Sequence, residues 1–296
     1  MREDVSIIQG WMYHGNLIAS LIRLFKRKSN LLWSVRQTLG GHRQDKFFTK
    51  LVVRLARLFT GYVSVTIYNS NVSLREHRDL LGYDTPAICI DNGYCDKQWI
   101  YSSTNRSKYR RKLKIPLDSK VVMFIGRNHP QKGIPILLEA FESMNSLIDN
   151  NYLVLMGKGF GLDQGLLEFT PSSNFGPNVI FVSEKRDVEK WISIADFVCL
   201  PSVFGEAFPN VVAESMCASV PCIATDIGET SRIIGDCGWV VNPNDVDGIR
   251  SALTAALSLE PGPLKRLRQQ CRKRIIENFS QKANVTKFEE LYSNFN

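Results

Sequence analysis

The sequence predicts an α/β protein made of two doubly wound parallel-sheet domains that face a cleft. Short, continuously apolar runs alternate with helical patterns along the chain, as in parallel sheets whose strands are buried on both faces. The length of 296 residues suits about two domains. Hydrophobic residues make up 44% of the chain, which is enough to bury a core in each domain.

The first 115 residues form the predicted N-terminal domain. Apolar and β-branched runs predict strands at Val5–Ile8, Leu31–Val35, Tyr62–Tyr68 and Ala87–Ile90. Helical spacing of apolar residues predicts helices at Asn16–Lys26, Lys46–Phe59 and Val72–Leu80. In the first helix, Leu17, Leu21 and Leu24 share one face.

A change of composition marks the predicted domain boundary. The segment from Lys97 to Lys114 is polar and basic and ends just before Pro116. This composition is typical of a connector with a short helix, so we place the boundary after residue 115. A second domain then covers residues 116–278, and a last helix occupies residues 279–296.

The second domain repeats the alternation of strands and helices. Strands are predicted at Lys120–Ile125, Tyr152–Met156, Val179–Val182, Phe197–Leu200, Cys222–Ala224 and Trp239–Val241. Helices are predicted at Gly133–Met144, Val188–Ile194, Pro209–Cys217 and from Asp245 onward. Ligands bind such sheets at the carboxyl ends of the strands, so the loops after strands are the first places to search for a site.

Excess positive charge is confined to the start of the chain. The net charge is +8, and residues 1–64 hold eleven Lys or Arg against three acids, so the remainder is balanced. This asymmetry indicates an anionic partner, either membrane headgroups or a phosphate-bearing acceptor. The basic helix Lys46–Phe59 either lies at an anionic membrane surface or packs in the domain with a solvated basic edge. No nucleic-acid motif accompanies the charge, which argues against a nucleic-acid partner.

Cysteine usage and the chain start indicate a cytoplasmic protein. The seven cysteines form no CxxC pair, and Cys199 and Cys222 lie in apolar strands, which favours buried reduced thiols over disulfides or zinc. The segment MREDVSIIQGW lacks the apolar core of a signal peptide. No apolar run approaches the ~20 residues of a membrane span. A peripheral position on the inner face of the plasma membrane is therefore the second expectation.

The most informative segment, Pro201–Gly228, follows a buried strand. Gly205 permits a tight turn, and Pro209 suits the first turn of a helix, whose leading N–H groups and dipole attract anions. Glu206 precedes this helix, and Glu214 lies five residues past Pro209, or about 7–8 Å along the axis. Two carboxylates so placed can hold both ends of an elongated ligand. The alternative is a plain crossover helix with two surface glutamates.

A second segment, Phe124–Phe141, carries two cations at the end of a strand. Arg127 follows Gly126, and Lys132 comes five residues later at a helix start. Such a pair suits a diphosphate, the Arg by forked hydrogen bonds and the Lys as a point charge. The alternative is two exposed basic residues in a loop.

Three further patterns are better explained by structure than by chemistry. Gly157–Gly161 (GKGFG) reads as a glycine-dependent turn rather than a phosphate loop. Asp245 and Asp247 imitate a metal-binding pair but stand where helix caps are expected, and no other pattern suggests a metal site. His129 lies in the loop near Arg127 and receives no role.

Phe204–Asp226 resembles the donor-binding motif of glycosyltransferase family 4, the retaining GT-B enzymes with two Rossmann-like domains. Two glutamates separated by seven residues are its signature, and Glu206 and Glu214 have that spacing. The flanking GEAFPN and VPCIATDIG agree as well. One departure is Ala218-Ser219, where the family usually has a glycine. The resemblance extends over about Val121–Val241.

The resemblance implies roles for individual residues. It assigns Glu206 to the donor-sugar hydroxyls, Glu214 to the nucleotide ribose, and Arg127 and Lys132 to the donor phosphates. The remaining donor-binding positions are Gly126, Gly205, Ala207, Phe208, Pro209 and Asn210. It also implies that no metal or other cofactor is needed beyond the nucleotide sugar, which is a co-substrate.

In the N-terminal part the resemblance is weaker. Gly10–Leu17 is similar to the family segment whose histidine lies near the transferred sugar, which suggests that role for His14 against the alternative of an ordinary helix residue. Trp33–Gln37, Tyr68–Ser70 and Ile90–Cys95 match the family's strand ends. The resemblance implies that the last helix returns to the N-terminal domain. Family members begin with a further strand, Gly-rich loop and helix, so we expect an incomplete N-terminal domain.

The expected function is retaining transfer of a sugar from a nucleotide diphosphate sugar, with a UDP-sugar favoured. The acceptor is a glycan or a polyprenyl-diphosphate-linked glycan, as in the biosynthesis of lipopolysaccharide and other surface polysaccharides. Such a protein is a metal-independent hexosyltransferase of class EC 2.4. The alternative is a protein that binds nucleotide sugars but is catalytically incomplete.

Overall fold

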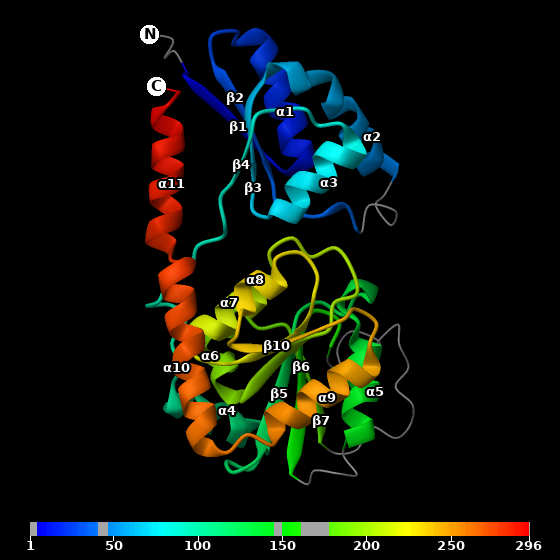
Figure 1. The fold of residues 1–296 in the computed structure, drawn as a ribbon, viewed down its shortest axis with the longest axis vertical. Coiled ribbons are helices and arrows are strands. Elements are labelled where there is room, and N and C mark those ends of the chain that lie inside the picture. The colour runs from blue at the N-terminus through cyan, green and yellow to red at the C-terminus, as the bar shows by residue number, and fades with distance from the viewer. Residues whose placement is uncertain (1–4, 41–46, 145–149, 161–177, 296) are drawn as a thin grey trace. The chain divides into compact units, whose positions relative to one another are not determined.

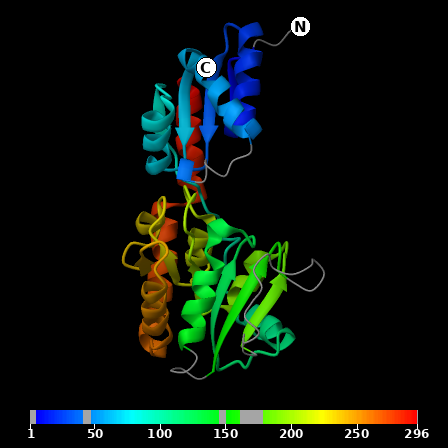
Figure 2. The same ribbon diagram turned by 90° about the vertical axis from the view of Figure 1, so that its right-hand side faces the viewer.

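The computed structural model describes residues 5–40, 47–144, 150–160 and 178–295. Its contacts divide the chain into two compact units. The first contains Met1–Gly93, Gly205–Phe208 and Gln281–Asn296, and the second contains Tyr94–Phe204 and Pro209–Ser280. Each unit has its own parallel sheet covered by helices (Figures 1 and 2). The predicted α/β class with two parallel sheets is confirmed.

The first unit is built on a four-stranded parallel sheet in the order β1-β2-β3-β4. Its strands are β1 (Ile7–Trp11), β2 (Asn30–Val35), β3 (Val63–Tyr68) and β4 (Ala87–Cys89). Its helices are α1 (Met12–Phe25), α2 (Phe47–Ala56), the 3₁₀ turn η2 (Arg57–Tyr62), α3 (Asn71–Leu81) and α11 (Gln281–Ser293). The predicted helix Lys46–Phe59 therefore becomes α2 followed by η2, and Lys46 itself lies outside the described residues.

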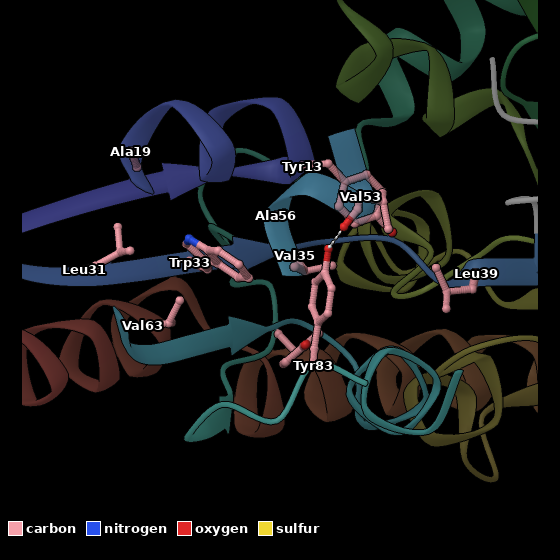
Figure 3. Packing of buried hydrophobic residues seen from close by; sticks show 11 residues of the cluster. Tyr13, Ala19, Leu31, Trp33, Val35, Leu39, Val53, Ala56, Val63 and Tyr83 are labelled. Atoms are coloured by element: carbon pink, nitrogen blue, oxygen red, sulfur yellow. Dashed lines mark hydrogen bonds between the residues drawn. The ribbon is translucent and has the colours of Figure 1, made fainter. Parts of the chain in front are cut away.

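Successive side chains of β2 pack into two separate hydrophobic cores, one on each face of the sheet. Leu31, Trp33 and Val35 pack with residues of α1 and α2 (Figure 3). In this core the hydroxyl of Tyr83 donates to the Val53 carbonyl at 3.0 Å. Leu32 points to the other face of the sheet, because successive strand residues alternate.

The last helix covers that other face. Leu291 of α11 packs in one cluster with Leu32, Val65, Ile67 and Ile90. Phe288 and Tyr292 add partly buried contacts. Apolar residues one turn apart thus explain why this segment belongs with the first unit.

Helix α1 buries a face of mixed polarity and exposes several large apolar side chains. The residues that face the sheet are Tyr13, Asn16, Ala19 and Ser20. At Gly10 of β1 an added Cβ would lie 2.5 Å from the Asn16 Cα, so only small residues fit there. The Asn16 side chain bridges to the Ser34 backbone at both N–H and C=O. The helix also begins at Met12, one turn before the predicted Asn16.

The second unit is built on a six-stranded parallel sheet in the order β10-β9-β8-β5-β6-β7. The strands are β5 (Lys120–Ile125), β6 (Asn151–Gly157), β7 (Val179–Ser183), β8 (Phe197–Leu200), β9 (Cys222–Thr225) and β10 (Gly238–Val241). The helices are α4 (Ser103–Lys112), α5 (Ile134–Met144), α6 (Val188–Trp191), α7 (Asn210–Cys217), α8 (Thr230–Ile234), α9 (Val246–Leu257) and α10 (Pro261–Asn278). Short 3₁₀ turns precede α5 (η3, Pro130–Lys132) and follow α6 (η4, Ile192–Ile194).

The strand order of this sheet reverses between β5 and β8. From β5 the chain proceeds to β6 and β7 on one side, and from β8 to β9 and β10 on the other. Helices α5 and α9 consequently pack together on one face, and α7 and α10 on the opposite face (Figure 1). Such a reversal opens a crevice outside the carboxyl ends of the two central strands.

Helix α4 is held in the second unit by a buried charge network. Arg110 is fully buried and donates to Asp196 at 2.7 Å, and Arg106 and Arg268 reach the same carboxylate at 2.8 and 2.9 Å. The contact-defined unit therefore begins at Tyr94, earlier than the boundary predicted after residue 115. Within the described residues, no helix has the length and apolar character needed to cross a membrane.

Candidate functional site

The two motif segments follow the two strands between which the order reverses. β5 and β8 are hydrogen-bonded neighbours, with Val122 opposite Phe197. Their loops are joined beyond the strands, because the Val203 N–H donates to the Gln131 carbonyl at 2.8 Å. Gly133 lies against Pro201 so closely that an added Cβ would stand 2.0 Å from its carbonyl oxygen. The fold thus places both motifs in the position where sheets of this type bind ligands.

The β5 loop presents the predicted cations at different depths. Gly126 directly follows the strand, and Arg127 beside it is exposed. Lys132 is half-buried, and its Cε lies 3.7 Å from the position of an added Gly126 Cβ. The glycine thus leaves room for the lysine stem at the strand end. The His129 ring caps the intervening turn by accepting from the Gln131 N–H at 3.2 Å.

Glycines at the end of β6 allow close backbone contact with the β5 loop. Gly157 adopts φ +147°, and an added Cβ would lie 1.9 Å from the Gly126 carbonyl oxygen. Gly159 adopts φ +91°. Both conformations favour glycine, which agrees with the interpretation of this segment as a turn. Gly161, the last residue of that pattern, lies outside the described residues.

The amino end of α7 faces the β8 loop without a side-chain cap. Pro209 is the N-cap residue, and its side chain offers no acceptor to the first-turn N–H groups. The helix runs from Asn210, one residue after the predicted start. The Tyr94 hydroxyl donates to the Asn210 side-chain oxygen at 2.7 Å. A helix start of this kind attracts an anion through its N–H groups and its dipole.

Glu214 lies on α7, and its carboxyl is largely buried. Burial raises the pKa of its carboxyl from the ordinary 4.5 to about 7. Its neighbours Ala213 and Ser215 are fully buried. A buried carboxyl with a raised pKa is common where a ligand is bound, because desolvation has a cost that a ligand can offset.

Glu206 belongs to a different contact group from Glu214. Gly205–Phe208 cluster with the first unit, whereas Pro209–Ser280 belong to the second. Gly205 adopts φ +77°, which explains the glycine in the turn. Glu206 is half-buried, and Ala207 and Phe208 are buried. The structure thus brings Gly126, Lys132 and the start of the β8 loop together where the two central strands end, while the Gly205–Phe208 loop is assigned to the other unit.

The departure at Ala218-Ser219 has a structural cost. Ser219 follows the end of α7 with φ +63°, the left-handed conformation that favours glycine. The Val220 N–H then donates back to the Ser215 carbonyl at 2.8 Å and closes the helix. Ser219 therefore adopts the left-handed backbone conformation at the position where the family usually has a glycine.

In the first unit, polar residues gather where strands end. His14 lies exposed in the first turn of α1. Arg36 follows β2, donates to the Asn92 side chain at 2.5 Å, and stacks its guanidinium 4.6 Å from the Trp11 ring centre. Asn69 follows β3 and donates to the same Asn92 oxygen at 3.4 Å. The sequence indicated these strand ends but not the hydrogen bond between Arg36 and Asn92. A polar residue directly after each apolar strand was the signal that could have identified them.

Asp245 and Asp247 of the second unit have structural partners, and a cavity adjoins the two motif loops. Asp245 caps α9 by accepting from the Gly248 N–H at 2.8 Å, which confirms its structural interpretation. Asp247 pairs with Arg250 at 2.8 Å. A cavity of about 440 Å³ opens beside the η3 turn, and its lining includes none of the predicted site residues.

The family described as "Glycosyl transferases group 1" matches residues 105–278. The phosphatidyl-myo-inositol mannosyltransferase of Mycobacterium leprae is 28% identical over 64% of this chain and 48% of its own length. The lipopolysaccharide 1,2-N-acetylglucosaminetransferase of Salmonella typhimurium is 26% identical over 70% of this chain and 56% of its own. The chain thus spans about half the length of the curated relatives it matches.

Among solved structures, Anabaena HepE in complex with UDP has a TM-score of 0.80 to this chain. The match covers 98% of this chain and 79% of HepE at 17% identity. At that identity the likeness concerns the fold. It agrees with the predicted GT-B arrangement of two parallel-sheet units, of which the first has four strands.

Proposed function

The chain belongs to the glycosyl transferases of group 1, and from that premise we propose that it transfers a sugar from a nucleotide diphosphate sugar to an acceptor hydroxyl. The observation that carries the proposal is the position of both motifs at the β5/β8 reversal of the second unit. A UDP-sugar is the favoured donor, because HepE, which shares the fold, was solved with UDP. The acceptor is a glycan or lipid-linked glycan of the cell surface, in keeping with the names of the two relatives.

The donor diphosphate binds at the end of β5 and the start of α7. Lys132, Arg127 and the first N–H groups of α7 stabilise the charge that develops on the leaving diphosphate. Glu206 orients the sugar and Glu214 accepts from the ribose hydroxyls. These roles need no metal ion.

The reaction proceeds with retention. The acceptor oxygen forms a bond to the anomeric carbon on the face from which the diphosphate departs. The acceptor proton passes to the departing phosphate oxygen, so the protein need not supply a base on the opposite face. His14 of the first unit lies near the transferred sugar in this proposal.

Removal of Lys132 tests the donor site. Lys132→Ala should lower kcat about 10²-fold, the scale of losing one such charge-stabilising group. Lys190→Ala is the matched control, because its ammonium is 53% exposed on α6 in the same unit. Donors are first screened by thermal shift with UDP-, GDP- and ADP-sugars, and turnover is then followed as nucleotide release. Equal turnover in the two variants, with intact donor binding, would contradict the site.

A catalytically incomplete donor-binding protein is the second candidate. It is favoured by one observation, namely that the family match covers residues 105–278, which carry both donor motifs, and does not extend over the first unit. Saturable binding of a nucleotide sugar without transfer or hydrolysis would support this candidate, and measurable transfer would exclude it.

We further propose that the first unit binds an anionic membrane surface through α1 and α2. Phe25 at the end of α1 is 88% exposed, and Phe48 and Leu58 are each 73% exposed. Ile18, Leu21 and Ile22 continue the outward apolar stripe of α1. Interfacial helices have such apolar faces beside cationic ones.

Basic residues surround these apolar side chains. Lys26, Arg27 and Lys28 directly follow Phe25 and are exposed, and Arg54 and Arg57 are exposed next to Leu55 and Leu58. Each such residue near an anionic surface contributes about 1 kcal/mol. This position would place a lipid-linked acceptor close to the protein.

Vesicle co-sedimentation tests the membrane proposal. Binding to vesicles with anionic lipid should fall strongly in Phe25→Asp and on raising the salt. Leu80→Asp is the control, because Leu80 is 70% exposed on α3 of the same unit. Absence of vesicle binding, or equal loss in both variants, would contradict the proposal. Self-association that Phe25→Asp abolishes would instead identify a protein interface.

A further inference from the structure

Two cysteines of the second unit, Cys237 and Cys271, lie in contact although they are 34 positions apart in the sequence. Cys237 lies in the turn between α8 and β10, and Cys271 lies on α10. The Cys271 thiol donates to the Cys237 carbonyl oxygen at 3.1 Å, which places its sulfur beside the Cys237 residue. Cys271 is fully buried, whereas Cys237 is partly exposed.

The surroundings of Cys237 favour its thiolate. The hydrogen bond from Cys271 and then the Arg274 guanidinium lower the pKa of Cys237 to about 7, against the effects of burial and of Asp236. Arg274 is held at this turn, because it donates to the Ile233 carbonyl at 2.8 Å and to the Arg232 carbonyl at 2.6 Å. The interaction with Cys237, and then burial, raise the pKa of Cys271. The two thiols therefore differ as an attacking and a resolving thiol do.

A cavity lies beside the chain neighbours of both cysteines. It has a volume of about 360 Å³ and is lined by Asp236 and Gly238, the residues on either side of Cys237. Gln270, which precedes Cys271, also lines it. Neither cysteine lines the cavity itself, so a reagent reaches Cys237 through the exposed part of its own side chain.

We propose that Cys237 and Cys271 form a reversible disulfide, with Cys237 reacting first with a low-molecular-weight disulfide such as oxidised glutathione. The Cys237 thiolate attacks one sulfur of that disulfide and releases one thiolate. The released thiolate takes the proton of Cys271, whose sulfur then attacks the mixed disulfide and releases a second thiolate. Two protein thiols and one small disulfide thus give one protein disulfide and two small thiols.

The disulfide would join α10 to the turn before β10. Arg272, next to Cys271, donates to the Cys217 carbonyl at 2.5 Å, at the end of α7. The bond would therefore form close to the helix that carries Glu214, yet it requires no ligand or turnover. Its test is independent of the proposed sugar transfer.

Peptide mapping decides the proposal. The folded protein is incubated with oxidised glutathione, alkylated and digested with trypsin without reduction. Cys237 and Cys271 are the single cysteines of the expected tryptic peptides 233–250 and 269–272. We expect these two peptides to appear as one linked species that dithiothreitol separates, and the rate of linkage to rise with pH through about 7.

Two variants identify the order of reaction. Cys271→Ser should retain one glutathione on peptide 233–250, and Cys237→Ser should leave peptide 269–272 unmodified. Cys95→Ser, which removes another partly exposed thiol, should link Cys237 and Cys271 as the wild type does. Glutathione adducts at Cys95 without any linked species, or linkage only after unfolding in urea, would overturn the proposal.

Discussion

Replacing Glu214 with Gln should raise the stability of the ligand-free protein at neutral pH and lower its affinity for the donor. The carboxyl of Glu214 is buried on α7, and its pKa rises from the ordinary 4.5 to about 7. The unfolded chain therefore releases this proton at a lower pH than the folded protein does. The protonated Glu214 carboxyl therefore contributes stability that is fully present below a pH of about 4.5 and is lost as the pH rises through about 7.

The pKa rise gives the size of the effect. The rise corresponds to about 3 kcal/mol between the two protonation states at most. Glu214 retains partial exposure, and solvent reduces the penalty, so we expect about 1–3 kcal/mol. Gln keeps the shape but never carries the charge. The variant should consequently exceed the wild type in unfolding free energy by that amount above a pH of about 7, and match it below about 4.5.

Urea unfolding of the ligand-free protein across this pH range measures the difference. Glu184→Gln is the control, because it removes the same charge from an exposed site of the same unit. In parallel, donor affinity should fall about 10–100-fold in Glu214→Gln, since a hydrogen bond to a charged group contributes about 1.5–3 kcal/mol. Parallel stability profiles of the wild type and Glu214→Gln would refute the reasoning about burial. Unchanged donor affinity would refute the ligand role.

Two other substitutions have outcomes that the backbone and the buried charges determine. Ser219→Gly should stabilise the protein by about 0.5–1 kcal/mol in urea unfolding, because Ser219 has φ +63° and a side chain there is strained. A loss of stability would contradict that account. Asp196→Asn should destabilise by about 3–5 kcal/mol, because Arg110, which is fully buried, loses its anionic partner. A loss of less than about 1 kcal/mol in the free energy of unfolding would show that the backbone carbonyls around Arg110 stabilise its charge without Asp196.

The strand pattern of the second unit could be read from the sequence with good accuracy. β5 was predicted at Lys120–Ile125 and has those bounds, because a continuous apolar run is buried on both faces. The Asp245 cap was predicted from its position before a helical run and is present. Such local signals suffice where neighbouring residues decide the structure.

The predictions were less accurate where distant residues decide the structure. In α1 the apolar spacing was recognised, but the helix turns its small and polar residues inward, because Gly10 brings β1 against Asn16. The polar segment around α4 was assigned to the first domain. Its arginines pack on Asp196, about 90 residues later in the chain, and this pairing has no local signature.

By itself the sequence determined the α/β class, the order of strands and helices, and the spacing of Glu206, Glu214, Arg127 and Lys132 within their motifs. These follow from periodicity and from short-range backbone requirements. Only the tertiary structure placed β5 beside β8, raised the pKa of Glu214 and brought Cys237 to Cys271. Burial and long-range pairing depend on how the whole chain packs, and no local run of residues encodes them.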